Sequence, residues 1–88
     1  MYRVVLLPHF KKQLKKHLKK YRSLKESVFI ALTTFGEGKE THLGGNVYKI
    51  RLQAPGLNKG KSSSFRLIVL VVEVEDILVP ITIYFKGD

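Results

Sequence analysis

Residues 65–74 read Phe-Arg-Leu-Ile-Val-Leu-Val-Val-Glu-Val, and this segment constrains the possible fold more than any other. Its side chains are apolar on both faces of an extended chain, with Arg66 and Glu73 as the exceptions. Such a composition is typical of a strand in the middle of a sheet rather than at its edge. We therefore expect the remaining elements to be arranged around residues 65–74.

Two further strands lie on either side of this stretch in the sequence. Residues 47–53 alternate between apolar and cationic side chains, which predicts a strand with one buried face. The apolar members are Tyr48, Ile50 and Leu52, and the cationic members are Lys49 and Arg51. After an expected turn at Glu75-Asp76, residues 77–86 form the last strand. Pro80 interrupts it, which indicates an edge or a bulge.

The N-terminal part of the chain predicts a short strand and a cationic helix. Residues 2–7 are β-branched and apolar, as in a strand, and Pro8 suits the first position of a helix. From there one helical arc docks on a core and holds Phe10, Leu14, His17, Leu18, Tyr21 and Leu24. The opposite arc, here called the lysine ridge, holds Lys11, Lys12, Lys15, Lys16, Lys19 and Lys20.

A second helix follows closely. Ser23 with Glu26 three residues later fits a capping box, and Gly36 is a natural stop. The apolar residues at helical spacing are Leu24, Val28, Ala31, Leu32 and Phe35. The short link predicts that the two helices form an antiparallel hairpin. Residues 36–46 are rich in Gly and charged side chains, and residues 54–64 are rich in Gly, Pro and Ser. Both compositions predict loops.

The order β-α-α-β-β-β predicts an α+β fold in one domain over residues 1–88. We expect an antiparallel two-helix hairpin packed on a small twisted, mostly antiparallel sheet of about four strands. With 88 residues, 44% of them hydrophobic, the chain is long and apolar enough for a single core. The expected core residues are Phe10, Leu14, Leu18, Val28, Leu32, Phe35, Ile50, Leu52, Leu67, Val69, Val71 and Ile83.

Charge limits the choice of partner. The 16 Lys and Arg residues exceed the 7 Asp and Glu residues, giving a formal net charge of +9. Such a field favours nucleic acid, an anionic membrane or an acidic protein. A membrane surface is the weakest of these, because the apolar face of the first helix is needed for the core and the chain has no Trp. Without cysteine there is no disulfide or thiolate metal site, and without an apolar segment of membrane or signal length we expect a cytoplasmic protein.

Two cationic groups are candidate sites. The lysine ridge carries like charges at i,i+4, which costs helix stability and suggests a polyanion that offsets it; the alternative is an ordinary solvated helix face. The second group lacks interleaved carboxylates and suits a phosphodiester; it comprises Lys49, Arg51, Lys59, Lys61, Arg66, Tyr84 and Lys86. The alternative is that Arg51 and Arg66 only cap the sheet through ion pairs, with Glu73 serving one of them.

The histidines carry weaker signals. His17 lies on the apolar arc and is expected to be a packed ring, and His9 lies at a helix start. Glu40-x-His42 fits either an acid–base pair or half of a metal site. No P-loop, nucleophile elbow, zinc-ligand spacing or dinucleotide fingerprint occurs, so no metal and no other cofactor is expected.

Four motifs resemble a known family. They are Val47-Tyr48-Lys49-Ile50-Arg51-Leu52, Gly60-Lys61-Ser62, Phe65-Arg66-Leu67-Ile68 and Ile81-Thr82-Ile83-Tyr84-Phe85-Lys86. Together they resemble the RelE-like toxins of bacterial type II toxin–antitoxin pairs within the RelE/ParE superfamily, most closely the HigB-like branch. The order of elements agrees over essentially the whole chain, and the motifs are specific for residues 47–86. One departure is Ser62-Ser63-Ser64 in place of the usual glycine pair, which leaves the loop less conformational freedom. A second is that the chain stops two residues after Lys86, whereas some relatives carry a catalytic residue in a longer tail.

The resemblance implies a helix hairpin on a small twisted sheet, binding to the ribosome, cleavage of mRNA in the A site and a cognate antitoxin. It assigns catalysis to Lys59, Lys61, Arg66, Tyr84 and Lys86. From the charge and position of the two candidate groups, contacts with RNA are expected at Lys49, Arg51, Lys12, Lys15, Lys16 and Lys19. Cleavage by attack of the 2′-OH on the adjacent phosphate needs a base, an acid and cations for the phosphorane, and no metal. Two alternatives stay open: a ParE-like DNA gyrase poison without nuclease activity, and an inactive member that binds RNA or the ribosome.

Overall fold

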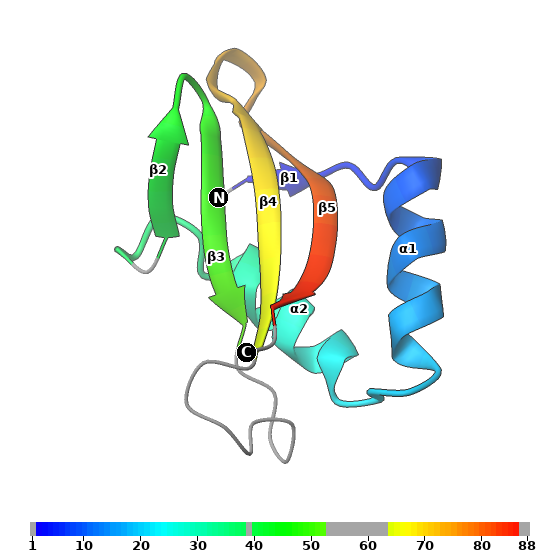
Figure 1. Ribbon diagram of the computed structural model, residues 1–88. Helices are drawn as coiled ribbons and strands as arrows, with labels where there is room; N and C mark the ends of the chain where they lie inside the picture. Colours follow the sequence, from blue (N-terminus) through cyan, green and yellow to red (C-terminus); the bar gives the residue numbers. More distant parts are fainter. Residues whose placement is uncertain (1, 39, 53–63, 87–88) are drawn as a thin grey trace.

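The computed structural model describes residues 2–38, 40–52 and 64–86. In these residues the chain is α+β, with two helices and a five-stranded mixed sheet in the order β1-β5-β4-β3-β2 (Figure 1). The strands are β1 (Arg3–Val4), β2 (Glu40–Gly44), β3 (Val47–Leu52), β4 (Ser64–Val72) and β5 (Ile77–Lys86). β1 is parallel to β5, and all other pairs are antiparallel. The two-faced apolar strand, β4, lies at the centre as predicted.

The β2 strand is a correction to the predicted loop at residues 36–46. Residues 40–44 pair with β3 instead, and the tight turn between them uses Gly44 and Gly45, whose φ angles of 125° and 55° favour glycine. The His42 ring stacks on Tyr48 with 4.8 Å between centroids. His42 Nε2 also lies 2.6 Å from the carbonyl oxygen of Gly45. These contacts stabilise a β2–β3 hairpin that the glycine-rich, charged composition of residues 36–46 did not predict. The sheet therefore has five strands rather than about four.

The helices form at the predicted places but not in the predicted arrangement. They are α1 (Pro8–Leu18) and α2 (Leu24–Thr33), with Pro8 at the helix start as expected. The capping box is wrong, because Ser23 has helical backbone angles and makes no side-chain capping hydrogen bond. Figure 1 shows α1 beside β5 and α2 behind the sheet, and the two helices have little contact with each other, so they do not form a closely packed hairpin. The helices diverge because α1 packs mainly on β5, whereas α2 packs on β3.

The pairing of β5 with its neighbouring strands explains the outcome of two further predictions. The first strand is shorter than residues 2–7, because its parallel pairing with β5 ends at Leu78 and the chain then leaves the sheet for α1. Further along, β4 and β5 change register where Ile68 pairs with Thr82 and Val69 pairs with Pro80. Ile81 is the extra residue of this bulge. The bulge predicted from Pro80 is therefore confirmed.

The predicted core is confirmed. The eight members that are buried are Phe10, Val28, Ile50, Leu52, Leu67, Val69, Val71 and Ile83. The other four pack against them while partly exposed; they are Leu14, Leu18, Leu32 and Phe35. Leu24, Phe65 and Leu78 are also buried. The predicted turn begins earlier than Glu75, as a 3-10 turn at Glu73–Glu75 followed by Asp76 with a left-handed backbone.

Neither helix in the described part of the chain is long and apolar enough to cross a membrane. The helices pack against the sheet. Hydrogen bonds to Gln13 also join α1 to the edge of β5. Gln13 Oε1 accepts hydrogen bonds from the backbone N–H of Ile83 at 2.7 Å and from the hydroxyl of Thr82 at 3.0 Å. Beyond Leu78, β5 has no described strand on this side. Gln13 therefore supplies the acceptor that a neighbouring strand would otherwise provide.

We predict that Gln13→Met destabilises the protein by about 1–3 kcal/mol, because the Ile83 N–H would lose its acceptor in a partly buried place. Met keeps the length and helix propensity of Gln. Urea unfolding measures the change, with Lys12→Met as the matched control on the exposed side of the same helix turn. Equal unfolding midpoints for the two variants would contradict this role of Gln13.

Candidate nucleic-acid interface

Three residues of the predicted cluster form one row across the central strands. Arg51 of β3 lies directly opposite Arg66 of β4, and Arg66 lies directly opposite Tyr84 of β5. Side chains of directly opposite residues project from the same face, with Cβ atoms about 4.5–5.5 Å apart. We call Arg51, Arg66 and Tyr84 the central row.

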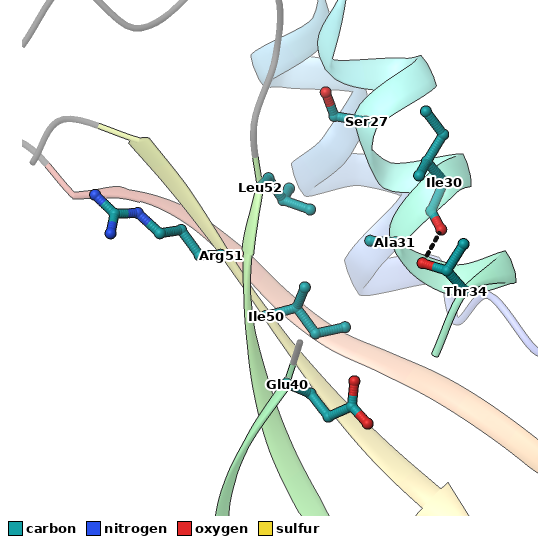
Figure 2. A pocket seen from close by; sticks show the side chains of 8 residues that line it. All are labelled: Ser27, Ile30, Ala31, Thr34, Glu40, Ile50, Arg51 and Leu52. Carbon is teal, nitrogen blue, oxygen red and sulfur yellow. Dashed lines mark hydrogen bonds between the residues drawn. The ribbon is translucent and has the colours of Figure 1, made fainter. Parts of the chain in front are cut away.

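The central row lies on the face of the sheet that is turned away from the helices. Figure 2 shows Ile50 and Leu52 pointing toward α2, while the Arg51 side chain between them points the opposite way. Because side chains alternate along a strand, Lys49 and Lys86 share this face with the row; we call it the open face, because neither described helix covers it. Five of the seven predicted members are thus brought together. Lys59 and Lys61, like most of the predicted basic loop, lie outside the described residues.

The bulge in β5 aligns Tyr84 with the arginines. Residues Val69 to Val72 of β4 pair with Pro80 to Ile77 of β5, and residues Ser64 to Ile68 pair with Lys86 to Thr82. Ile81 therefore has no partner in β4, and the pairing shifts by one residue there. Without the extra residue Ile81, Arg66 would lie opposite Ile83 rather than Tyr84. Bulges often redirect side chains near functional sites. The bulge at Ile81 therefore keeps Ile83 in the core and places a phenol beside Arg66.

The three side chains of the central row differ in their exposure to solvent. Arg66 is only 8% exposed, Arg51 is exposed, and Tyr84 is 40% exposed. Like charges directly opposite each other destabilise a sheet, so the Arg51–Arg66 pair has a cost. Two guanidinium forks at this spacing present several donors to an anion, and planar forks match phosphate oxygens.

Polar side chains flank Arg66 across the neighbouring strands. Its sequence neighbours Phe65 and Leu67 point into the core, whereas its cross-strand neighbours are Arg51 and Tyr84. An ion pair with Glu73 is excluded. Arg66 and the last residue of β4 before Glu73 are separated by about 20 Å of extended strand. Glu73 therefore serves neither arginine within the monomer.

Lys11, Lys12, Lys15 and Lys16 of the lysine ridge lie on α1, and Lys19 and Lys20 follow its last residue, Leu18. All six lysines are exposed, while Phe10 on the opposite arc is buried. The predicted packing of His17 is confirmed by its edge-to-face contact with Phe65, at 4.9 Å between ring centroids. α1 is joined through Gln13 to Ile83, the residue before Tyr84. Gln13 belongs to none of the sequence motifs; its one signal is its position where the apolar and cationic arcs meet.

Glu40 and His42 do not join the central row. The contacts of His42 with Tyr48 and Gly45 hold the β2–β3 hairpin, and Glu40 lines a cavity on the other face. Within residues 2–38, 40–52 and 64–86, no group of three or more His, Cys, Asp or Glu side chains is placed to hold a metal ion.

The cavity beside Glu40 is not suited to a phosphodiester. It has a volume of about 140 Å³ between α2 and β3, and its walls are largely apolar (Figure 2). Ile30, Ile50 and Leu52 line it, and Glu40 is its carboxylate, which would repel a phosphate. Arg51 also lines the cavity, but its side chain points toward the opposite face of the sheet (Figure 2), so the cationic groups of the central row lie on that sheet face rather than in this cavity.

No protein-family model matches the chain, and no curated protein matches it at a significant level. The evidence for function in this chain is therefore its side chains and the geometry that the sheet gives them. The central row is the strongest element of that geometry, and the lysine ridge is the second.

We predict that RNA binding depends on the lysine ridge. In the triple variant Lys12→Glu, Lys15→Glu, Lys19→Glu, affinity for ribosomes and single-stranded RNA should fall, because phosphate contacts are lost. With about six phosphate contacts, the parent protein should lose roughly three orders of magnitude in affinity between low and moderate salt, and the variant should lose less. Fluorescence anisotropy measures both slopes.

A single pair of substitutions provides the matched control for the ridge. Lys15→Glu reverses one ridge charge, and Lys25→Glu reverses one exposed charge on α2. The net charge of the two variants is equal, so only position differs. If both single substitutions lower the affinity equally, the ridge acts only through net charge and not through its position. If the triple variant binds RNA as tightly as the parent, the ridge is an ordinary solvated helix face.

Proposed function

We propose that this protein is a ribosome-dependent mRNA endonuclease, the RelE- or HigB-like toxin of a type II toxin–antitoxin pair. The observation that carries the proposal is the alignment of Arg51, Arg66 and Tyr84 across three strands of an open face, with Lys86 on the same face. The motif resemblance assigns the same residues to RNA binding and cleavage. The fold supports the proposal at the level of a small α+β domain, with two helices and a mixed, mostly antiparallel sheet.

The proposed reaction needs no external reactant. The 2′-oxygen of one nucleotide attacks the adjacent phosphorus, and the bond from phosphorus to the 5′-oxygen breaks. A base takes the proton of the 2′-OH, and an acid gives a proton to the departing 5′-oxygen. The products are a 2′,3′-cyclic phosphate and a 5′-hydroxyl. The negative charge on the phosphorane oxygens is what the enzyme must stabilise.

The central row fits this requirement. Arg66 is nearly buried and is held between two strands, so its fork needs little reorganisation to bind a phosphate. Arg51 can approach the same anion from the exposed side. Tyr84 is placed to stack on a base or to donate a proton, and Lys86 adds a further donor. Lys59 and Lys61 complete the proposed catalytic set, with Lys49 beside the row as an RNA contact.

The partners follow from the same charges. The lysine ridge would contact ribosomal RNA or mRNA phosphates through Lys12, Lys15, Lys16 and Lys19, while the central row meets the scissile phosphate. A cytoplasmic nuclease of this kind requires a cognate antitoxin, and acidic side chains would complement its cations.

We predict that Arg66→Lys and Arg51→Ala each slow cleavage by about a hundredfold or more, because a point charge or a methyl group cannot replace a forked donor at the phosphorane. Single-turnover cleavage of mRNA on programmed ribosomes measures the rate, and thermal melts follow the fold. Arg51 is exposed, so its variant should remain folded even where substitution of Arg66 lowers stability. Arg3→Ala, an exposed cation on β1, is the control and should retain the parent rate.

Two results would contradict the proposal. Folded Arg66→Lys and Arg51→Ala proteins that cut at the parent rate would remove the central row from the site. A parent protein that leaves mRNA intact but inhibits supercoiling by DNA gyrase would favour the ParE-like alternative. Ribosome binding without any cleavage would favour the inactive RNA-binding member.

A further inference from the structure

The open face carries an aliphatic patch next to the central row. Register places these side chains on the same face as Lys49, which lies opposite Ile68. From Ile68 the patch continues at every second residue of β4 and onto the opposite positions of β3 and β5. The patch consists of Val47, Ile68, Leu70, Val72, Ile77 and Val79, and each of them is partly exposed.

Such a patch is unusual for a surface that contacts only water. The apolar pattern of β4 is that of a strand buried on both faces, yet both described helices lie on one side of the sheet (Figure 1). Contiguous aliphatic side chains on an open face commonly mark a contact surface. Sheets with an apolar face bury it against another layer.

The charges at the two ends of the patch differ in sign. At one end lie Arg51 and Lys86, both exposed. At the other end the β4–β5 turn exposes Glu73, Glu75 and Asp76. Leu70 lies near the middle, four residues after Arg66 and three before Glu73. A second identical face, turned through 180°, would therefore place its acidic turn over the cations of the first.

We propose that the aliphatic patch binds a second copy of this chain in a twofold, face-to-face dimer. In it, the Glu73–Glu75 turn of each copy pairs with Arg51 and Lys86 of the other. Sheets pack face to face about 10 Å apart, a distance that long Arg, Lys and Glu side chains span. If the function proposed above holds, the dimer is an inhibited form, because the partner's carboxylates occupy the positions of the RNA phosphate.

The size of the face indicates a weak dimer. Nine residues of β4 extend about 30 Å, and three strands span about 14 Å, so two faces together bury on the order of 900 Å². That area is typical of transient interfaces. The charge of +9 on each copy also opposes association. RNA, which binds the same cations, should therefore dissociate the dimer.

Sedimentation equilibrium of the full chain tests the patch. Val79→Ser should weaken self-association by roughly a hundredfold, because a twofold interface contains each substitution twice. Val74→Ser is the matched control, since Val74 is 95% exposed in the turn and lies outside the patch. Equal effects of the two substitutions, or a parent protein that stays monomeric at about 1 mM, would overturn the proposal and leave the patch to a different partner.

Charge reversal tests the orientation. One variant carries Glu73→Lys with Glu75→Lys, and another carries Arg51→Glu with Lys86→Glu. Each should fail to self-associate, because like charges meet at both ends. An equimolar mixture should associate, because both ends of the mixed dimer then pair opposite charges. A mixture that stays monomeric, or a single variant that self-associates like the parent, would overturn this arrangement.

Activity separates the dimer from the nuclease proposal. The Glu73→Lys, Glu75→Lys variant keeps the whole central row, so its rate per molecule should not fall as protein concentration rises, whereas the rate of the parent should. If neither the parent protein nor the Glu73→Lys, Glu75→Lys variant cleaves mRNA, the nuclease proposal fails. The mixing experiment tests the dimer independently of cleavage. If the parent cleaves equally well per molecule as monomer and as dimer, the inhibitory role of the dimer is wrong.

Discussion

The pairing of β4 with β3 and β5 determines both faces of the sheet at once. On the face toward the helices, Leu67 lies between Ile50 and Ile83 and all three are buried. On the other face, one residue earlier in β4, Arg66 lies in the central row. Because side chains alternate, a shift of one residue in either pairing would move apolar side chains to solvent and charged ones into the core. The core thus fixes the geometry of the candidate site.

Magnitudes show why the sheet tolerates the opposed arginines. A directly opposite pair of side chains changes stability by about 0.2–1 kcal/mol, whereas full burial of one large apolar side chain contributes about 1.5–3 kcal/mol. Phe65, Leu67 and Ile83 are fully buried on the reverse of the same segment. The repulsion between Arg51 and Arg66 is therefore small beside the burial that sets the register.

Periodicity in the sequence predicted both helices and the three central strands, because each has a regular apolar pattern over at least six residues. It missed β2, whose glycines and charges resemble a loop and whose stability comes from contacts with β3. The packing of the two helices on different strands and the hydrogen bonds of Gln13 also depend on residues far apart in the sequence. For the site, Arg51, Arg66 and Tyr84 were predicted as a group. Their alignment depends on the bulge at Ile81, and Pro80 signalled the bulge without indicating which residue would face Arg66.

Cleavage by the central row would leave its chemical products at the new ends of cellular mRNA. The direct measurement is to induce expression in bacterial cells and to map new RNA ends, with the Arg66→Lys variant in parallel. The expected result is paired 5′-hydroxyl and 2′,3′-cyclic phosphate ends inside translated codons, absent with the variant and absent when initiation of translation is blocked. Growth arrest without new RNA ends, accompanied by breaks in DNA, would contradict it.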